Sequence, residues 1–133
     1  LKKIGLFLSR RRRIFEIYNN AFVDNKFITL PFESKDCFTN WHLYVLQIDF
    51  DTLGKDRADI IRSLKDKGIC TQVHYIPVHT QPFYRKHFGT NWGDCPRAEA
   101  YYKKCLSIPI FPAMSNEDID KVVNSLSEVL SKL

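Results

Sequence analysis

Hydrophobic residues recur at helical spacing in some segments of the chain and at every second position in others. Residues 3–22 carry an apolar stripe at helical spacing, and residues 26–30 form a short predicted strand that ends at Pro31. In residues 41–50 both alternating faces are partly apolar, which predicts a central strand. The stripe of the first helix consists of Ile4, Phe7, Leu8, Ile14, Phe15, Tyr18 and Phe22.

The middle of the chain predicts a capped helix that leads into a further strand. Asp56 is a suitable N-cap residue, and Gly68 supplies the left-handed exit that ends many helices. Residues 83–94 are aromatic and have no clear period, so we interpret them as a lid or surface loop. The buried stripe expected for the capped helix is Ile60, Ile61 and Leu64.

Two more helices and a short edge strand are predicted in the last third of the chain. Pro96 opens a helix, and residues 107–110 follow it as the edge strand. Ser115 and Asp118 approximate a capping box for the final helix. The helix after Pro96 is expected to carry Ala98, Tyr101, Tyr102 and Cys105 on one side, and the final helix has a full apolar stripe of Ile119, Val122, Val123, Leu126, Val129, Leu130 and Leu133.

Residues 68–82 contain polar side chains that could bind a ligand, within a pattern that is typical of a buried strand. Period-two alternation predicts one core-facing side and one free side. Pro77 and Pro82 each lack a backbone donor, so the strand should stop near Tyr75 and the chain should leave it with His79 on a stiff loop. The core-facing residues would be Ile69, Thr71, Val73 and Tyr75, and the free ones Cys70, Gln72, His74 and Ile76.

The composition is that of a globular domain. The chain has 133 residues, of which 44% are hydrophobic and 26% charged, so it is long enough for one compact domain with a core. No stretch approaches the length of a membrane span, and we predict neither membrane insertion nor disorder. The chain begins with Leu1 and has no signal-peptide pattern, and its only methionine is Met114. We therefore expect it to be part of a longer protein.

The formal net charge of +5 raises the question of an acidic partner. Residues 10–13 are four consecutive arginines. On a helix, four consecutive side chains fan around the whole axis, so they do not form one patch. We predict no nucleic-acid binding. The arginines are expected to lie on a solvated helix face, with Arg10 and Arg13 as candidates to contact a partner domain or a second subunit.

The four cysteines are widely spaced and include no CxxC pair, which favours reduced thiols in a cytoplasmic protein over a disulfide framework. A metal cluster of Cys70, His74 and His79, with His42 and Cys95 as extra donors, is an alternative. Zinc sites usually begin with a tight cysteine pair or an i, i+4 histidine pair on a helix, and neither is present. We predict no metal site.

Five strings between residues 41 and 118 carry a family resemblance. In this order and spacing they resemble the DegT/DnrJ/StrS family of sugar aminotransferases. Within that family, their sequences are most similar to those of the enzymes of the pseudaminic acid pathway, which aminate a UDP-linked keto-sugar. The strings are Trp41–Asp49, Gly68–His79 followed by Gln81–Pro82, Cys95–Glu99, Leu106–Pro112 and Met114–Asp118.

The resemblance implies the type I fold of pyridoxal-phosphate (PLP) enzymes, of which this chain would be the C-terminal α/β small domain, a mainly antiparallel sheet flanked by helices. Residues 1–24 would be the interdomain helix and residues 25–133 the small domain. In the family, PLP is held as a Schiff base by a lysine of the large domain. No lysine here follows the family's Ser-x-x-Lys pattern, so no catalytic residue is assigned in this chain.

The resemblance also implies that Gln72, Val73, His74 and Tyr75 form one wall of the sugar-nucleotide pocket, with His79 contributing from the loop. Side chains of Gln and His supply the donors and acceptors that sugar hydroxyls or a diphosphate need. Without the resemblance, a histidine or tyrosine on a strand is more often structural. Trp41 and His42 are expected to serve in packing.

Two functions therefore remain open at the level of sequence. The favoured one is a PLP-dependent aminotransferase that moves an amino group from an amino acid, such as glutamate, to a nucleotide-linked keto-sugar for polysaccharide or glycan biosynthesis. The parent enzyme would be a cytoplasmic homodimer, and this chain alone would be inactive. The alternative is a stand-alone binding or interaction module that keeps the fold without catalysis.

Overall fold

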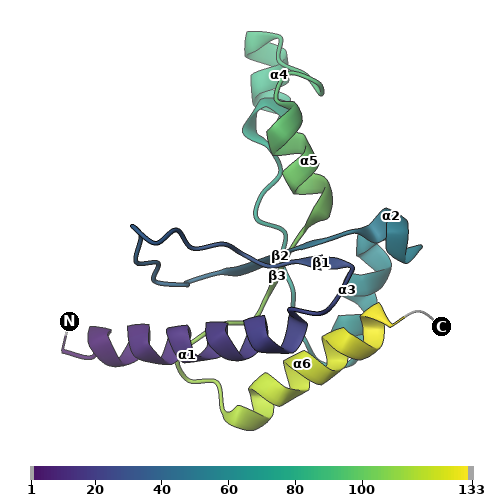
Figure 1. Cartoon of the computed structure of the whole chain (residues 1–133). Helices are drawn as coiled ribbons and strands as arrows, with labels where there is room; N and C mark the ends of the chain where they lie inside the picture. The colour runs from purple at the N-terminus through teal and green to yellow at the C-terminus, as the bar shows by residue number, and fades with distance from the viewer. Residues whose placement is uncertain (1, 132–133) are drawn as a thin grey trace.

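A three-stranded antiparallel sheet crosses the centre of the computed structural model, which describes residues 2–131 (Figure 1). The strands are β1 (Ile28–Thr29), β2 (Tyr44–Ile48) and β3 (Cys105–Ile108), in the order β1-β2-β3. The predicted mainly antiparallel sheet with flanking helices is confirmed. The predicted central strand is confirmed too, but it covers 44–48 and not 41–50, because Phe50 begins α2. The predicted edge strand exists but begins two residues earlier, at Cys105.

Helices α1 and α6 lie together on one side of the sheet, and α3 packs against α6 (Figure 1). The predicted caps form: Asp56 accepts a hydrogen bond from the Asp59 backbone N–H at 2.8 Å, and Ser115 and Asp118 make a reciprocal capping box. Gly68 has a φ of 77°, a left-handed conformation that favours glycine. The helices are α1 (Ile4–Phe22), α2 (Phe50–Leu53), α3 (Arg57–Asp66), α4 (Pro82–Phe88), α5 (Pro96–Lys104) and α6 (Asn116–Leu130), with a 3₁₀ turn η1 (Val78–Thr80).

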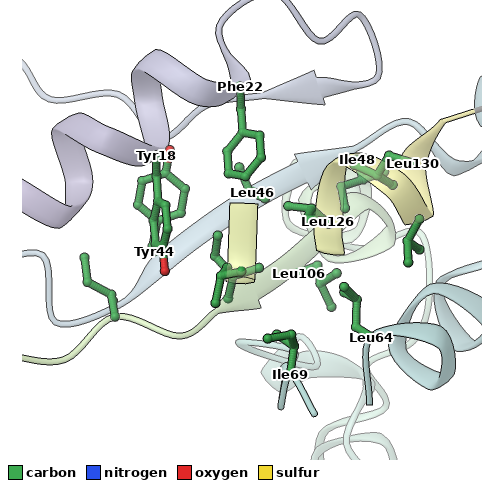
Figure 2. Close-up of a cluster of buried hydrophobic side chains, with 14 of the residues drawn as sticks. Tyr18, Phe22, Tyr44, Leu46, Ile48, Leu64, Ile69, Leu106, Leu126 and Leu130 are labelled. Carbon is green, nitrogen blue, oxygen red and sulfur yellow. The ribbon is translucent and has the colours of Figure 1, made fainter. Parts of the chain in front are cut away.

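The core forms where β2 and β3 face α1, α3 and α6 (Figure 2). Trp41 is buried and stacks on Phe15 with ring centroids 3.7 Å apart, which confirms its predicted packing role. Leu133 of the predicted final stripe lies outside the described residues. The stripe of α1 is buried only in its C-terminal half, and Ile4 and Phe7 in its N-terminal half are exposed. Fully buried side chains include Tyr18, Tyr44, Phe22, Leu46, Ile48, Leu64, Leu106, Leu126 and Leu130.

Three of the four arginines of α1 bind other segments of the same chain. The guanidinium of Arg10 donates to the Met114 carbonyl at 2.6 Å. Nη1 of Arg11 donates to three carbonyl oxygens, those of Trp41, His42 and Ile110. Arg12 forms a bidentate salt bridge with the carboxylate of Glu33, with N···O distances of 2.9 and 3.0 Å. Within residues 2–131 Arg10 thus contacts its own chain, and a contact of Arg10 or Arg13 with a partner domain or a second subunit stays a prediction.

Residues 77–104, which we term the arm, project from the opposite side of the sheet (Figure 1). The predicted loop at 83–94 is wrong in its first half, because α4 forms there, with Pro82 at its first position and the left-handed Gly89 at its end. No residue of α4 is buried. The side predicted for α5 is only partly buried: Cys105 at its C-cap is buried, but Ala98 and Tyr101 are exposed. The buried residue within α5 is Glu99. Trp92, after α4, is exposed.

No helix within residues 2–131 is both long enough and apolar enough to cross a bilayer.

Candidate functional site

The segment that follows Gly68 does not continue as a strand. It meets the sheet at one bridge, in which the Gln72 N–H donates to the Ser107 carbonyl at 3.1 Å and the Ser107 N–H donates to the Gln72 carbonyl at 2.8 Å. The next ladder positions on β3 lack a free donor: Pro109 has no N–H, and the Cys105 N–H donates to the Tyr101 carbonyl at the end of α5. The predicted strand is therefore reduced to a single bridge.

The bridge and its neighbours border a surface hollow of about 300 Å³. Gln72 and His74 both line it, as expected for two residues on the free side of the segment. Cys70 lines it from the same segment, and the remaining lining comes from the two residues before β2 and from the end of β3 and the residues after it. Three segments distant in sequence therefore contribute. We term this the Gln72–His74 hollow; its full lining is His42, Leu43, Cys70, Gln72, His74, Ser107, Ile108, Pro109, Ile110 and Phe111.

His74 is held from the sheet. Its Nδ1 lies 2.8 Å from Oγ of Ser107, and its ring meets the ring of Tyr75 edge-on, with centroids 4.6 Å apart. The peptide bond between His74 and Tyr75 is cis. Tyr75 is 70% exposed, so the expectation that it faces the core is wrong, because the chain has already left the sheet after Gln72. Val73 is half-buried.

His79 is placed in a different environment from Gln72 and His74. Its Nε2 lies 2.8 Å from Oε1 of Glu99, and both side chains are only 11% exposed. The same carboxylate accepts the N–H groups of Gly93 and Cys95 at 2.8 and 3.2 Å. The contact with His79, followed by these two backbone donors, lowers the pKa of Glu99. One carboxylate thus joins η1, the 91–95 loop and α5. His79 is bound there and does not line the Gln72–His74 hollow.

Sequence reasoning missed Ser107 and Glu99 as chemically important residues. Ser107 is a polar residue in an otherwise apolar string, and that interruption was the signal that could have identified it. Glu99 sits on a helix whose aromatic residues suggested an apolar buried face. His42 was expected to pack, but it is exposed at the rim of the hollow and contacts Asn40.

A scan against protein-family models matches residues 1–127 to the DegT/DnrJ/EryC1/StrS aminotransferase family. The chain belongs to this family. Its resemblance in five short strings thus extends to nearly the whole sequence.

Relatives of the family share both sequence and fold with the chain. It is 40% identical over 131 residues to the spore coat polysaccharide biosynthesis protein SpsC of Bacillus subtilis, covering 98% of this chain and 34% of SpsC. The S. venezuelae protein DesV, solved in complex with a ketimine intermediate, has a TM-score of 0.89 and 26% identity over 100% of this chain and 34% of DesV. Helicobacter pylori PseC, an aminotransferase involved in the biosynthesis of pseudoaminic acid, has a TM-score of 0.86 and 25% identity over 98% of this chain and 34% of PseC.

The chain spans about a third of the length of the curated relatives that it matches. The fold predicted from the family resemblance agrees with the fold of these solved neighbours.

The hollow of this family member contains no lysine among its lining residues. A Schiff base with an aldehyde cofactor requires a lysine amine. The hollow by itself therefore does not fit PLP as a covalent site, and an amine from outside the hollow would be needed.

The metal alternative is not supported by the geometry either. Within residues 2–131, no three or more His, Cys, Asp or Glu side chains are grouped so that they could hold a metal ion. His74 and His79 instead contact Ser107 and Glu99, in different parts of the molecule.

Proposed function

We propose that this chain is the C-terminal small domain of a PLP-dependent sugar aminotransferase, with residues 1–24 as the interdomain helix and residues 25–133 as the domain. The whole enzyme would transfer an amino group from an amino acid, such as glutamate, to a nucleotide-linked keto-sugar. The observation that carries the proposal is the family match over residues 1–127. The same match favours an enzyme over a stand-alone binding module.

PLP, when bound, supplies the electron sink that an amino transfer requires. The large domain would hold it, because the lysine that forms the Schiff base is expected there. This chain's share of the reaction is to bind and orient the sugar nucleotide. In isolation it is expected to be inactive.

Gln72 and His74 are the proposed substrate-binding residues, because they line one hollow with free polar groups. The Gln72 amide can both donate and accept, and the imidazole offers one donor or acceptor in addition to its contact with Ser107. Val73 and Tyr75 belong to the same segment, and they would supply apolar and aromatic surface beside these two residues. His79 is proposed to act indirectly, by holding the arm through Glu99.

The finer assignment is a UDP-linked keto-sugar of the pseudaminic acid type, in surface polysaccharide or glycan biosynthesis. The similarity to PseC, an aminotransferase involved in the biosynthesis of pseudoaminic acid, supports the sugar, and the similarity to SpsC, a spore coat polysaccharide biosynthesis protein, supports the pathway. We further propose that the whole enzyme is a cytoplasmic homodimer. The four cysteines, all free in this structure, are compatible with a reducing compartment.

The test uses the intact enzyme with both domains and the variants His74→Ala and Gln72→Ala. Each should raise the KM for the UDP-sugar by roughly tenfold, the cost of one lost hydrogen bond to a polar ligand. PLP loading, followed by its absorbance, should stay unchanged. His87→Ala on α4, which lies outside the hollow, is the matched control.

Unchanged saturation by the sugar in both hollow variants would remove Gln72 and His74 from the site. Failure of the intact protein to aminate any nucleotide-linked keto-sugar would contradict the function itself.

A further inference from the structure

Ser107 holds an unusually constrained position beside the Gln72–His74 hollow. It is 4% exposed and lies inside β3, where it pairs with Val45 of β2. On its other edge, both its N–H and its carbonyl bond to the backbone of Gln72. The Ser107 backbone is thus fixed by two neighbours, and its hydroxyl meets Nδ1 of His74 at 2.8 Å.

The hydrogen bond between Ser107 and His74 has a preferred direction. A serine hydroxyl has one proton to donate. Within residues 2–131, the hydrogen-bond partner of Ser107 Oγ is Nδ1 of His74. If Nδ1 carried the proton and donated, the Ser107 proton would lack an acceptor in a buried place, which costs free energy. The favoured arrangement has Ser107 donating to an unprotonated Nδ1.

An imidazole that accepts at Nδ1 carries its proton on Nε2 in the neutral form. Within the described part of the chain, Nε2 of His74 has no hydrogen-bond partner. The N–H at Nε2 is therefore available to a ligand in the hollow that His74 lines.

We propose that Ser107 is a positioning residue that fixes His74 as the Nε2–H tautomer, so that the site presents a hydrogen-bond donor to an oxygen of the sugar nucleotide that only accepts, such as a carbonyl or diphosphate oxygen. The inference rests on the proposed function for the identity of the ligand. The tautomer itself is a property of this chain alone.

The first test is spectroscopic and needs no activity. Long-range ¹H–¹⁵N correlation spectra of the histidine-labelled chain, recorded above the reference histidine pKa of about 6.5, distinguish protonated from unprotonated ring nitrogens. The signals of His74 are those lost in His74→Gln. We expect a proton on Nε2 in the unsubstituted chain, a tautomer mixture in Ser107→Ala, and a return to Nε2–H in Ser107→Thr.

Ser125→Ala is the matched control, because Ser125 is a buried serine on α6 and does not line the hollow. It should leave the His74 signals unchanged. A proton on Nδ1 of His74 in the unsubstituted chain would overturn the inference even if Ser107→Ala fails to fold. So would the same single tautomer in Ser107→Ala.

The second test uses the intact enzyme. Ser107→Ala should raise the KM for the sugar nucleotide roughly two- to tenfold, as expected for one weakened hydrogen bond, with kcat nearly unchanged and with rescue by Ser107→Thr. An unchanged KM in a variant whose tautomer is mixed would overturn the donor role. If the enzyme aminates no nucleotide sugar, the proposed function fails, while the spectra still decide the tautomer.

Discussion

The body of the molecule and its arm are stabilised in different ways. The body, formed by the sheet with α1, α3 and α6, is held by a continuous set of fully buried apolar side chains (Figure 2). In the arm, residues 77–104, α4 buries nothing and α5 buries one carboxylate, that of Glu99. The body thus depends on apolar burial, whereas polar contacts, several of which meet at Glu99, hold much of the arm.

The arm is therefore the part of the molecule that can open locally. An isolated helix as short as α4 is marginal in water, so its order depends on the contacts at its two ends. Those contacts converge on His79 and Glu99. We therefore expect the arm to loosen without unfolding of the body.

The largest effect is expected from a core substitution in the body. Leu126 is 0% exposed, so Leu126→Ala should lower the free energy of unfolding by about 2–5 kcal/mol through lost burial and a residual cavity. Phe83→Ala in α4 is the matched substitution in the arm, and since Phe83 is 60% exposed the change should stay within about 0.5 kcal/mol. Urea unfolding curves measure both. Equal losses would refute the contrast between body and arm.

An intermediate and local effect is expected from Glu99→Gln. The amide keeps the size of the side chain but removes the charge that three donors share. Hydrogen exchange at the amides of Gly93 and Cys95 should accelerate by roughly tenfold or more, while exchange in β2 should not change. Glu128→Gln removes an exposed ion pair with Lys67 and serves as control. Uniform acceleration over both regions would show that the arm is not a separate unit.

The smallest effect concerns a carboxylate in the body, and it depends on pH. The hydrogen bond from Arg12, together with the N–H of Thr39, lowers the pKa of Glu33 to about 2 from an ordinary value of 4.5. Because the folded-state pKa is the lower one, the contribution of Glu33 is fully present above pH 4.5 and is lost as the pH falls toward 2. Thermal unfolding of Glu33→Gln should therefore show a flatter acid limb than the unsubstituted chain. Parallel profiles would contradict this.

The sequence was sufficient to predict the body because its elements follow apolar periodicity. The stripes of α3 and α6, the alternation in β2 and the caps at Asp56 and Ser115 all act locally, so each could be inferred from a few neighbouring residues. The arm could not be predicted in this way. In α4 the aromatic residues remain exposed, and in α5 the buried residue is charged, which reverses the usual rule.

The candidate site was predictable in its residue types but not in its arrangement. Gln72 and His74 were correctly placed on one free side, since two residues that are two apart share a face. The early end of the predicted strand depends on Pro109 and on the end of α5, both of which lie far along the sequence from the segment itself. The partner of His74, Ser107, is equally distant. Local patterns contain no information on such contacts.

One of the two tryptophans of the chain lies in the body and the other in the arm. Trp41 is buried in the body against Phe15, whereas Trp92 is half-exposed in the arm, 6.1 Å from the ring of Tyr102. Each region therefore carries its own intrinsic fluorophore. Replacing either tryptophan by phenylalanine would leave tryptophan emission from one region only. Fluorescence excited at the tryptophan band could then follow the body and the arm separately, without any attached label.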